Sequence, residues 1–226
     1  MKYKKERELL IETGKHLYEK ELISGSEGNL SLRLNEEEIL TTPSGLCKGK
    51  LKPADLVIVD LNGKVKSGQL PVSSEILLHL EYYNNRKDVH AVIHSHPVNC
   101  ISLMLAGISL NRPYLPEMVV MLGVVPTASY ATPSTDEVPK SIQKYVKKTD
   151  AILLDHHGAV VGSQDMQTAL LKLETLEHAA EAIVKAYQIR RHAPRSLNKD
   201  AVKTLIKLRK ERYKVPGAFI DEFQFS

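Results

Sequence analysis

The spacing of apolar positions changes several times along the chain, and each change marks the start of a predicted helix or strand. Residues 4–23 carry apolar side chains at near-helical spacing and end at a Ser-Gly pair, where a helix would stop. Three short segments follow, at residues 29–34, 38–42 and 55–61, with the alternating or continuous apolar pattern of strands and with turn residues between them. The pattern predicts an N-terminal helix followed by a meander of strands.

Helical and strand-like segments alternate through the rest of the chain. Helices are predicted over about 73–83, 98–106, from near 134, over 164–187 and over 199–213. Strands are predicted over 91–96, 124–130 and 151–162. Strands interleaved with helices indicate an α/β protein whose sheet is covered on both faces.

Composition narrows the class of protein. The chain has 226 residues, of which 42% are hydrophobic and 26% charged, and no linker-like stretch interrupts it, so we expect residues 1–226 to form a single globular domain. The net charge of +4 is spread along the chain, which argues against a nucleic-acid partner. The N-terminus is too charged for a secretion signal and no run approaches the ~20 apolar residues of a membrane span, so we expect a cytoplasmic protein.

The candidate metal ligands are histidines rather than cysteines. Cys47 and Cys100 have no CxxC spacing, which argues against a disulfide framework and a thiolate zinc site. His94 and His96 stand one residue apart at the end of the apolar segment AVIHSHP, so in an extended strand both would project from one face. Two such imidazoles can share a metal ion, although a catalytic site needs three or four ligands. The alternative is a pair of ordinary, partly buried histidines bonded to backbone or water.

A second histidine pair supplies a candidate third ligand. His156 and His157 follow another apolar strand and precede a glycine in LLDHHGAVV. Alternation allows only one of them to face the site directly, while the other takes a supporting or purely structural place. Three neutral imidazoles with an open fourth position suit catalytic zinc.

Small polar residues form three candidate anion sites. In PVSSEILLH, Ser73 and Ser74 stand where a helix would begin, and Glu75 follows in the first turn. The common meaning of such a triplet is a plain helix cap with an acidic first-turn residue. His79 lies one turn beyond Glu75, where a core or supporting role is expected. The loops GSEGNLS and TPSG could also present backbone N–H groups to an anion, although ordinary turns have the same composition.

With these motifs in order, the chain resembles the class II aldolase/adducin family, and within it most closely the aldolases that act on L-fuculose 1-phosphate. Six segments, spread over about three quarters of the chain, carry the resemblance: GSEGNLSLR, TTPSGLCKGKL, PVSSEILLHLEYY, AVIHSHPVN, VVPTASYATPST and LLDHHGAVVG. The resemblance implies an α/β three-layer α/β/α sandwich with a central mixed or antiparallel sheet. It also implies a zinc ion held by three histidines, with a carboxylate that acts as acid/base and can touch the metal: His94, His96, His157 and Glu75. The phosphate site that it implies consists of Ser26, Asn29, Ser44, Gly45, Ser73 and Ser74.

The resemblance further implies a homotetramer whose active sites lie at subunit interfaces. A tyrosine near the C-terminus helps to cover the site in the family, and Tyr213 matches it. Another tyrosine, from the neighbouring subunit, protonates the aldehyde oxygen in fuculose-phosphate aldolases. It lies in a stretch that reads PYLPEMVVMLG here, where Glu117 stands at its position and Tyr114 lies three residues earlier. Both are therefore candidates for that acid.

The activity implied by the resemblance is reversible cleavage of a ketose 1-phosphate, such as L-fuculose 1-phosphate, into dihydroxyacetone phosphate and an aldehyde. Zinc would stabilise the enediolate charge and Glu75 would move the proton. Two other enzymes of the family are alternatives: a pentulose-phosphate 4-epimerase, which typically carries Asp where Glu75 stands, and a methylthioribulose-phosphate dehydratase. A non-catalytic adducin-like scaffold is the alternative of another class, and it has no need of three metal histidines with a carboxylate.

Overall fold

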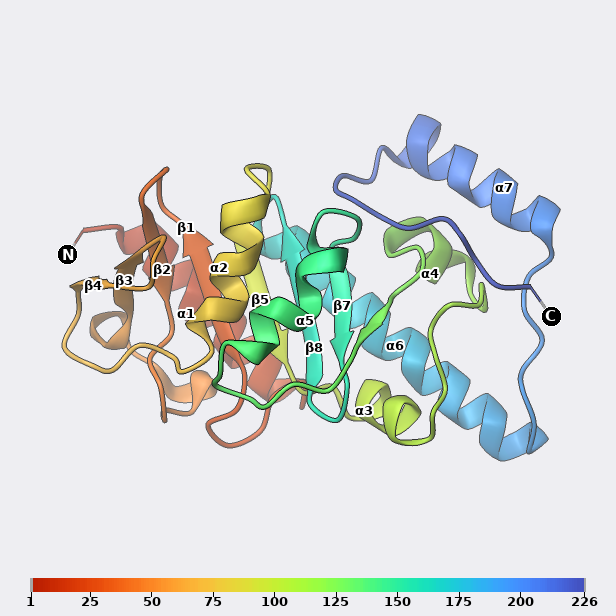
Figure 1. Cartoon of the computed structure of the whole chain (residues 1–226), viewed down its shortest axis with the longest axis horizontal. Coiled ribbons are helices and arrows are strands. Elements are labelled where there is room, and N and C mark those ends of the chain that lie inside the picture. The colour runs from red at the N-terminus through yellow and green to blue at the C-terminus, as the bar shows by residue number, and fades with distance from the viewer. Residues whose placement is uncertain (1, 226) are drawn as a thin grey trace.

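A computed structural model describes residues 2–225 and contains one eight-stranded sheet in the order β4-β3-β2-β1-β5-β8-β7-β6 (Figure 1). Neighbouring strands are antiparallel, except for the parallel pair β6 and β7. The strands are β1 (Asn29–Arg33), β2 (Glu38–Thr41), β3 (Val57–Asp60), β4 (Val65–Ser67), β5 (Ala91–Ser95), β6 (Thr127–Ala128), β7 (Ala151–Leu154) and β8 (Gly158–Ser163). The first three strands form the predicted meander, and β4, which was not predicted, extends it.

Helices cover both faces of the sheet. They are α1 (Lys4–Glu19), α2 (Ile76–Asn85), α3 (Val98–Leu105), α4 (Pro116–Met121), α5 (Glu137–Val146), α6 (Met166–Arg190) and α7 (Lys199–Leu208), and a π-helical turn, Arg209–Tyr213, follows α7. Helices α2 and α5 lie in front of the sheet and α1 and α6 behind it (Figure 1). The three-layer α/β/α prediction is therefore confirmed. Among the described residues, no helix is long and apolar enough to cross a membrane.

The strands are apolar on both faces because each face is covered by helices. In β5, Ile93 packs into the core on the side of α1, α3 and α6, whereas Val92 packs into the core on the side of α2 and α5. Val161 and Val160 divide in the same way in β8. Alternate side chains thus pack into two separate apolar layers. This explains why the sequences of these strands are nearly continuous apolar runs.

Four predicted boundaries were wrong, each for a local reason. The first helix ends at Glu19 rather than near residue 23, and Leu22 and Ile23 enter the core from the irregular segment that follows. The strand predicted over 124–130 contracts to Thr127–Ala128, because Pro126 cannot donate to a sheet ladder. The helices predicted from residue 73 and from near 134 begin at Ile76 and Glu137. Helix α4 was not predicted, although Pro116 at its first position is a typical start.

Candidate active site

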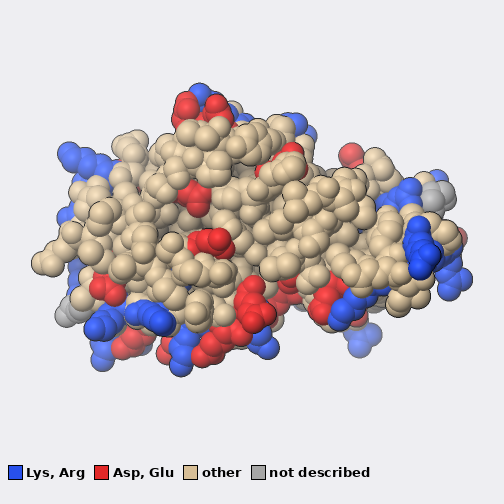
Figure 2. Space-filling view, turned by 90° about the horizontal axis from the view of Figure 1, so that it is seen from below, with Lys and Arg blue, Asp and Glu red and all other residues tan. Residues whose placement is uncertain are grey.

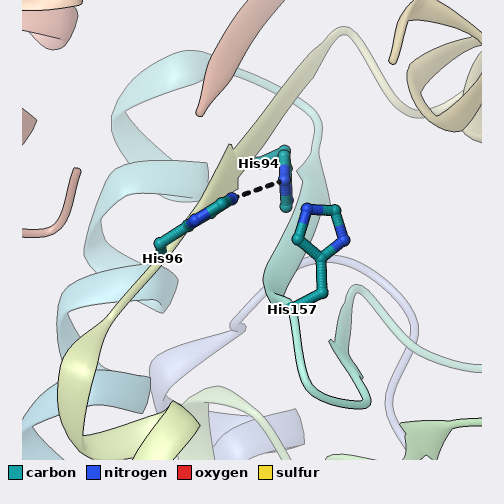
Figure 3. Close-up of side chains that lie close together, drawn as sticks. All are labelled: His94, His96 and His157. Carbon is teal, nitrogen blue, oxygen red and sulfur yellow. Dashed lines mark hydrogen bonds between the residues drawn. The ribbon is translucent and has the colours of Figure 1, made fainter. Parts of the chain in front are cut away.

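Three histidines from two neighbouring segments converge at one end of the sheet. His94 belongs to β5, His96 follows directly after it, and His157 lies in the turn between β7 and β8. One ring nitrogen of each lies within 4.8 Å of those of the other two, and the Nε2 atoms of His94 and His96 are 3.1 Å apart (Figure 3). The expectation that strand alternation turns His94 and His96 to the same face is confirmed by this geometry.

Hydrogen bonding and burial prepare the rings for a cation. The Nδ1 atom of His94 donates to the carbonyl of Ala159 at 3.0 Å, which leaves Nε2 without a proton when the ring is neutral. Burial, with the nearby His94 and His157, lowers the pKa of His96 to about 3. Burial, followed by the proximity of His94, lowers the pKa of His157 to about 4. Both rings are therefore neutral at pH 7, the form that binds metal ions.

The turn between β7 and β8 separates the roles of the second histidine pair. His156 has a φ of 55° and its side chain is 58% exposed, 4.0 Å from Asp155 at the nearest polar atoms. His157 instead turns inward, with its side chain 10% exposed. The two residues lie in a turn rather than on a strand, so strand alternation does not explain which of them faces inward; the left-handed backbone at His156 accompanies the inward direction of His157.

Glu75 does not act as a helix cap. It is the N-cap residue of α2, one position before the helix and not inside its first turn, and its side chain accepts no capping hydrogen bond. Oε2 accepts a hydrogen bond of 3.0 Å from Asn29 Nδ2 and lies 3.3 Å from His94 Nε2. Oε1 lies 3.3 Å from His157 Nε2, and it is buried with no hydrogen bond from the described residues. The carboxylate is directed at the histidines.

The electrostatics of Glu75 favour its charged form. Burial alone would raise the pKa of this carboxyl. The hydrogen bond to His94, the positive charge that His94 and His157 carry at acid pH, where the carboxyl titrates, and the Asn29 amide outweigh burial and hold the pKa far below its usual range. An unpartnered oxygen of a carboxylate then faces three convergent imidazole nitrogens. This donor set fits a divalent cation bound between the histidines and Glu75.

A polar pocket adjoins the carboxylate and includes every residue predicted for the phosphate site. Its lining comprises Ser26, Glu27, Gly28, Asn29, Ser44, Gly45, Lys48, Ser73, Ser74, Glu75 and His96. Gly45 has a φ of 73° and no atom within 4 Å of the place where a Cβ would stand, so this backbone borders open space. The amides at the start of α2 are less available than predicted, because Glu75 N donates to Ser73 Oγ and Ile76 N to Ser73 O.

Lys48 is a pocket residue that we did not predict from sequence. It is 2% exposed, and its ammonium group donates to the carbonyl of Ser26 at 2.5 Å. Among residues 2–225 it forms no ion pair within 4.0 Å, and burial lowers its pKa. The segment TPSGLCKGKL contains several lysines, which its sequence alone would place on the surface. Only the fold shows that Lys48 is buried at the pocket.

Three predicted site residues lie elsewhere in the chain. Tyr114 is buried in the core on the side of α6, and Glu117 is exposed on α4. Tyr213 is 54% exposed at the end of the π-helical turn after α7. Figure 1 shows α4 and α7 together at one end of the molecule, apart from the turn between β7 and β8. Among the described residues, none of the three forms a hydrogen bond or ion pair with the histidines.

The end of the molecule that carries this turn is seen face-on in Figure 2. Most lysine and arginine side chains gather toward its margins, and several acidic side chains lie nearer the middle. This view reveals no broad basic surface on that face. The basic groups relevant to an anion are therefore individual ones, such as the buried Lys48.

Comparison with known proteins agrees with this site. Residues 8–184 match the class II aldolase and adducin N-terminal domain. The chain is 34% identical to a 3-oxo-tetronate 4-phosphate decarboxylase of Escherichia coli over 78% of this chain and 85% of that protein. It is 30% identical to a 5-deoxy-D-ribulose 1-phosphate aldolase of Bacillus thuringiensis over 92% of this chain and 96% of that protein. A solved L-fuculose 1-phosphate aldolase superposes with a TM-score of 0.83 at 30% identity, covering 93% of this chain and 98% of the other. The protein therefore belongs to the class II aldolase and adducin family.

Proposed function

We propose that this protein is a zinc-dependent aldolase that reversibly cleaves a ketose 1-phosphate, L-fuculose 1-phosphate or a similar sugar, into dihydroxyacetone phosphate and an aldehyde. The observation that carries the proposal is the position of Glu75. Its carboxylate lies between the three histidines and the hydroxyl-lined pocket and has no capping role. A carboxylate shared by a cation site and a polar pocket suits proton transfer on a substrate held at both.

His94, His96 and His157 would hold the zinc ion, with Glu75 as a ligand that substrate can displace. The 3.1 Å between the Nε2 atoms of His94 and His96 is close to the ~3.4 Å expected for two nitrogens bound at about 2.1 Å to one tetrahedral ion. When bound, zinc would supply the Lewis acidity that stabilises negative charge on the enediolate of the three-carbon product.

The residues of the chain supply position and proton transfer. The hydroxyls of the pocket and the backbone at Gly45 would bind the phosphate, and Lys48 would balance its charge, because this buried cation has no ion-pair partner among the described residues. Glu75, once freed from the cation, would carry the proton that the enediolate carbon gains during cleavage and would remove that proton in the reverse reaction. The phosphate contacts keep the reacting carbons beside these groups.

We also propose that the active site is completed across subunits of a homotetramer. Tyr213, with Glu117 or Tyr114, would reach the histidines of a neighbouring chain, because none of the three is bonded to those of its own among the described residues. A neighbour's side chain would then accept the proton of the substrate hydroxyl that becomes the aldehyde oxygen, return it in the reverse reaction, and cover the site.

A second candidate activity is decarboxylation of a phosphorylated 3-oxo acid, supported by the 34% identity to 3-oxo-tetronate 4-phosphate decarboxylase. Both reactions break a carbon–carbon bond beside a carbonyl and leave an enediolate, so one site can stabilise either. They differ in the leaving fragment, which is carbon dioxide in one case and an aldehyde in the other. We favour the aldolase because an aldolase is the relative matched over 92% of the chain, including its C-terminal part.

The experiment is a direct comparison of products from the zinc-loaded protein. A panel of ketose 1-phosphates is assayed for dihydroxyacetone phosphate, and 3-oxo-tetronate 4-phosphate is assayed for carbon dioxide. We expect the ketose phosphates to be cleaved with the higher kcat/KM. Faster release of carbon dioxide would replace the proposal with the decarboxylase, and absence of both activities together with absence of stoichiometric zinc would indicate a scaffold.

Metal analysis of two neighbouring variants tests the ligand set. His157→Ala should reduce bound zinc well below one ion per chain, whereas His156→Ala should keep the wild-type content, because His156 points away from the other histidines. Equal zinc content in the two variants would contradict the assignment.

A further inference from the structure

A chain of four hydrogen bonds runs behind the pocket and ends at Glu75. Tyr83 OH lies 2.7 Å from Ser31 Oγ, and Ser31 Oγ lies 2.6 Å from His79 Nδ1. His79 Nε2 lies 2.5 Å from Asn29 Oδ1, and Asn29 Nδ2 donates to Glu75 Oε2 at 3.0 Å. The four residues before Glu75 are all buried, so water does not compete for these partners.

The fold places the hydrogen-bonded residues of β1 and α2 opposite one another. Asn29 and Ser31 are two residues apart on β1 and share one face of the strand. His79 and Tyr83 are four residues apart on α2 and share one face of the helix. Because α2 packs on that face of the sheet, each strand residue meets a helix residue. The pairing joins positions 46–52 residues apart in the sequence.

The protons of this series of hydrogen bonds can be placed in only one order. A carboxylate only accepts, so Asn29 directs its N–H at Glu75 and its carbonyl at His79. His79 must therefore donate from Nε2, and a neutral ring then has a bare Nδ1 that accepts from Ser31. Ser31 has used its one proton, so Tyr83 donates to Ser31. Complete burial of His79 lowers its pKa to about 3, in agreement with a neutral ring.

We propose that His79 is a positioning residue that fixes the amide orientation of Asn29. In this orientation Asn29 presents its N–H donors, and not its carbonyl oxygen, to the polar pocket. Asn29 lines the pocket, and its Nδ2 carries a second proton besides the one given to Glu75. A rotated amide would place its oxygen against both the carboxylate and an incoming anion. His79 thus sets the polarity of the pocket without touching the ligand.

The first test reads the proton order directly and does not depend on activity. Nitrogen NMR of the histidine rings in the wild-type protein reports which nitrogen of His79 carries hydrogen. We expect hydrogen on Nε2 and none on Nδ1 throughout pH 5–9. Hydrogen on Nδ1, or a doubly protonated ring at pH 7, would overturn the inference.

The second test rests on the phosphate role proposed for the pocket and measures binding of inorganic phosphate to the zinc-loaded protein by calorimetry. His79→Gln keeps an N–H donor at the place of Nε2, so affinity should stay within about threefold of wild type. His79→Met has similar size but no donor, so affinity should fall about tenfold or more, the usual effect of losing a hydrogen bond to a charged group.

Tyr83→Phe is the matched control. It removes a buried hydroxyl of the same hydrogen-bond series and should lower the stability of the protein. His79 still accepts a hydrogen bond from Ser31, so phosphate affinity should stay within about threefold of wild type. Equal weakening by Tyr83→Phe and His79→Met, or no weakening by His79→Met, would show that the network is only structural. A wild-type protein that binds no phosphate would reject the proposed pocket function, and the ring NMR would still decide the role of His79.

Discussion

Glu75 occupies a position whose local sequence fits two roles. Ser-Ser-Glu before an apolar run is the common sequence of a helix start, and a carboxylate there ordinarily bonds backbone amides. In this fold both carboxylate oxygens turn away from the helix, toward Asn29 and the histidines. An acid that makes no capping bond and leaves one buried oxygen unsatisfied needs another partner, and a cation bound at the histidines would supply one.

The substitution Glu75→Gln separates the catalytic role from the structural one. The amide is nearly isosteric and the histidines still hold zinc, so melting temperature and zinc content should stay close to those of the wild type. Turnover should fall about 10²–10⁴-fold, mainly in kcat, because a general acid/base group is lost. Steady-state cleavage at verified zinc occupancy measures this. Glu181→Gln, at an exposed carboxylate of α6, is the control that should keep full activity. Near-normal kcat in Glu75→Gln would remove Glu75 from the mechanism.

Lys48 permits a similar comparison of two neighbouring lysines. Lys48→Met removes the buried cation of the pocket, so KM for a phosphorylated ketose should rise about tenfold or more, since charged hydrogen bonds contribute about 1.5–3 kcal/mol. Lys50→Met removes an exposed charge two residues away and should leave KM unchanged. The same KM in both variants would show that Lys48 serves only the loop at Ser26.

At the scale of single residues, sequence reasoning succeeded where spacing along one element decided the geometry. His94 and His96 are an example, because their two-residue spacing at the end of β5 brings both rings together. Sequence reasoning did not predict contacts between segments that are distant along the chain. The bond between His79 and Asn29 joins residues 50 apart, and no local pattern shows which nitrogen of the ring donates. Burial of Lys48 likewise depends on how the loops pack together.

At the scale of elements, β7 connects two different functions. His157 lies three residues after its last residue, and Asp150 directly precedes its first. Asp150 Oδ1 accepts from Arg86 at 2.5 Å and from the amide of Ala218 at 3.0 Å, while Oδ2 accepts from Lys172 at 2.5 Å. The C-terminal segment is thus anchored at the end of the strand opposite the histidines.

Periodicity predicted α6 and β7 but not this anchor. Arg86 follows α2 and Lys172 belongs to α6, so the buried ion pairs bring together helices from opposite faces of the sheet. A lysine at position 172 continues the polar pattern of a surface helix, yet its side chain is 1% exposed. Tertiary packing overrides the local pattern where a buried acid satisfies the cation.

Gly217→Ala tests the anchor. Gly217 has a φ of 91°, and a Cβ there would lie 1.9 Å from Asp150 Oδ2. The variant should lose about 3–5 kcal/mol of stability, the usual effect of disrupting a buried ion pair, and amides near residue 217 should exchange faster. Gly107→Ala is the control, since Gly107 has a φ of 69° and open space around it, and it should lose only about 1–2 kcal/mol of backbone strain. Urea unfolding and hydrogen exchange measure both. Equal losses in the two variants would show that Asp150 does not hold the segment.

At the scale of the whole molecule, the described chain carries its cation site and its C-terminal tyrosine on different parts of the fold. The anchor at Asp150 fixes the segment that follows Tyr213, and α7 packs with α4, the helix that carries Glu117. These contacts hold α7 and the segment after Tyr213 against other parts of the chain, and Tyr213 itself is exposed. The proposed homotetramer supplies a route to the histidines, in which each chain offers Tyr213 to its neighbour.

Mixing two inactive variants tests this route. Glu75→Gln and Tyr213→Phe chains are co-expressed with different tags, and assemblies that contain both are purified. If Tyr213 acts on the neighbouring site, about a quarter of the sites combine an intact Glu75 with an intact Tyr213, and about that fraction of wild-type activity should return. If Tyr213 acts within its own chain, no site holds both groups and no activity returns beyond that of the parents. Sedimentation of the wild type checks the assembly independently: a monomer with full activity would refute a shared site.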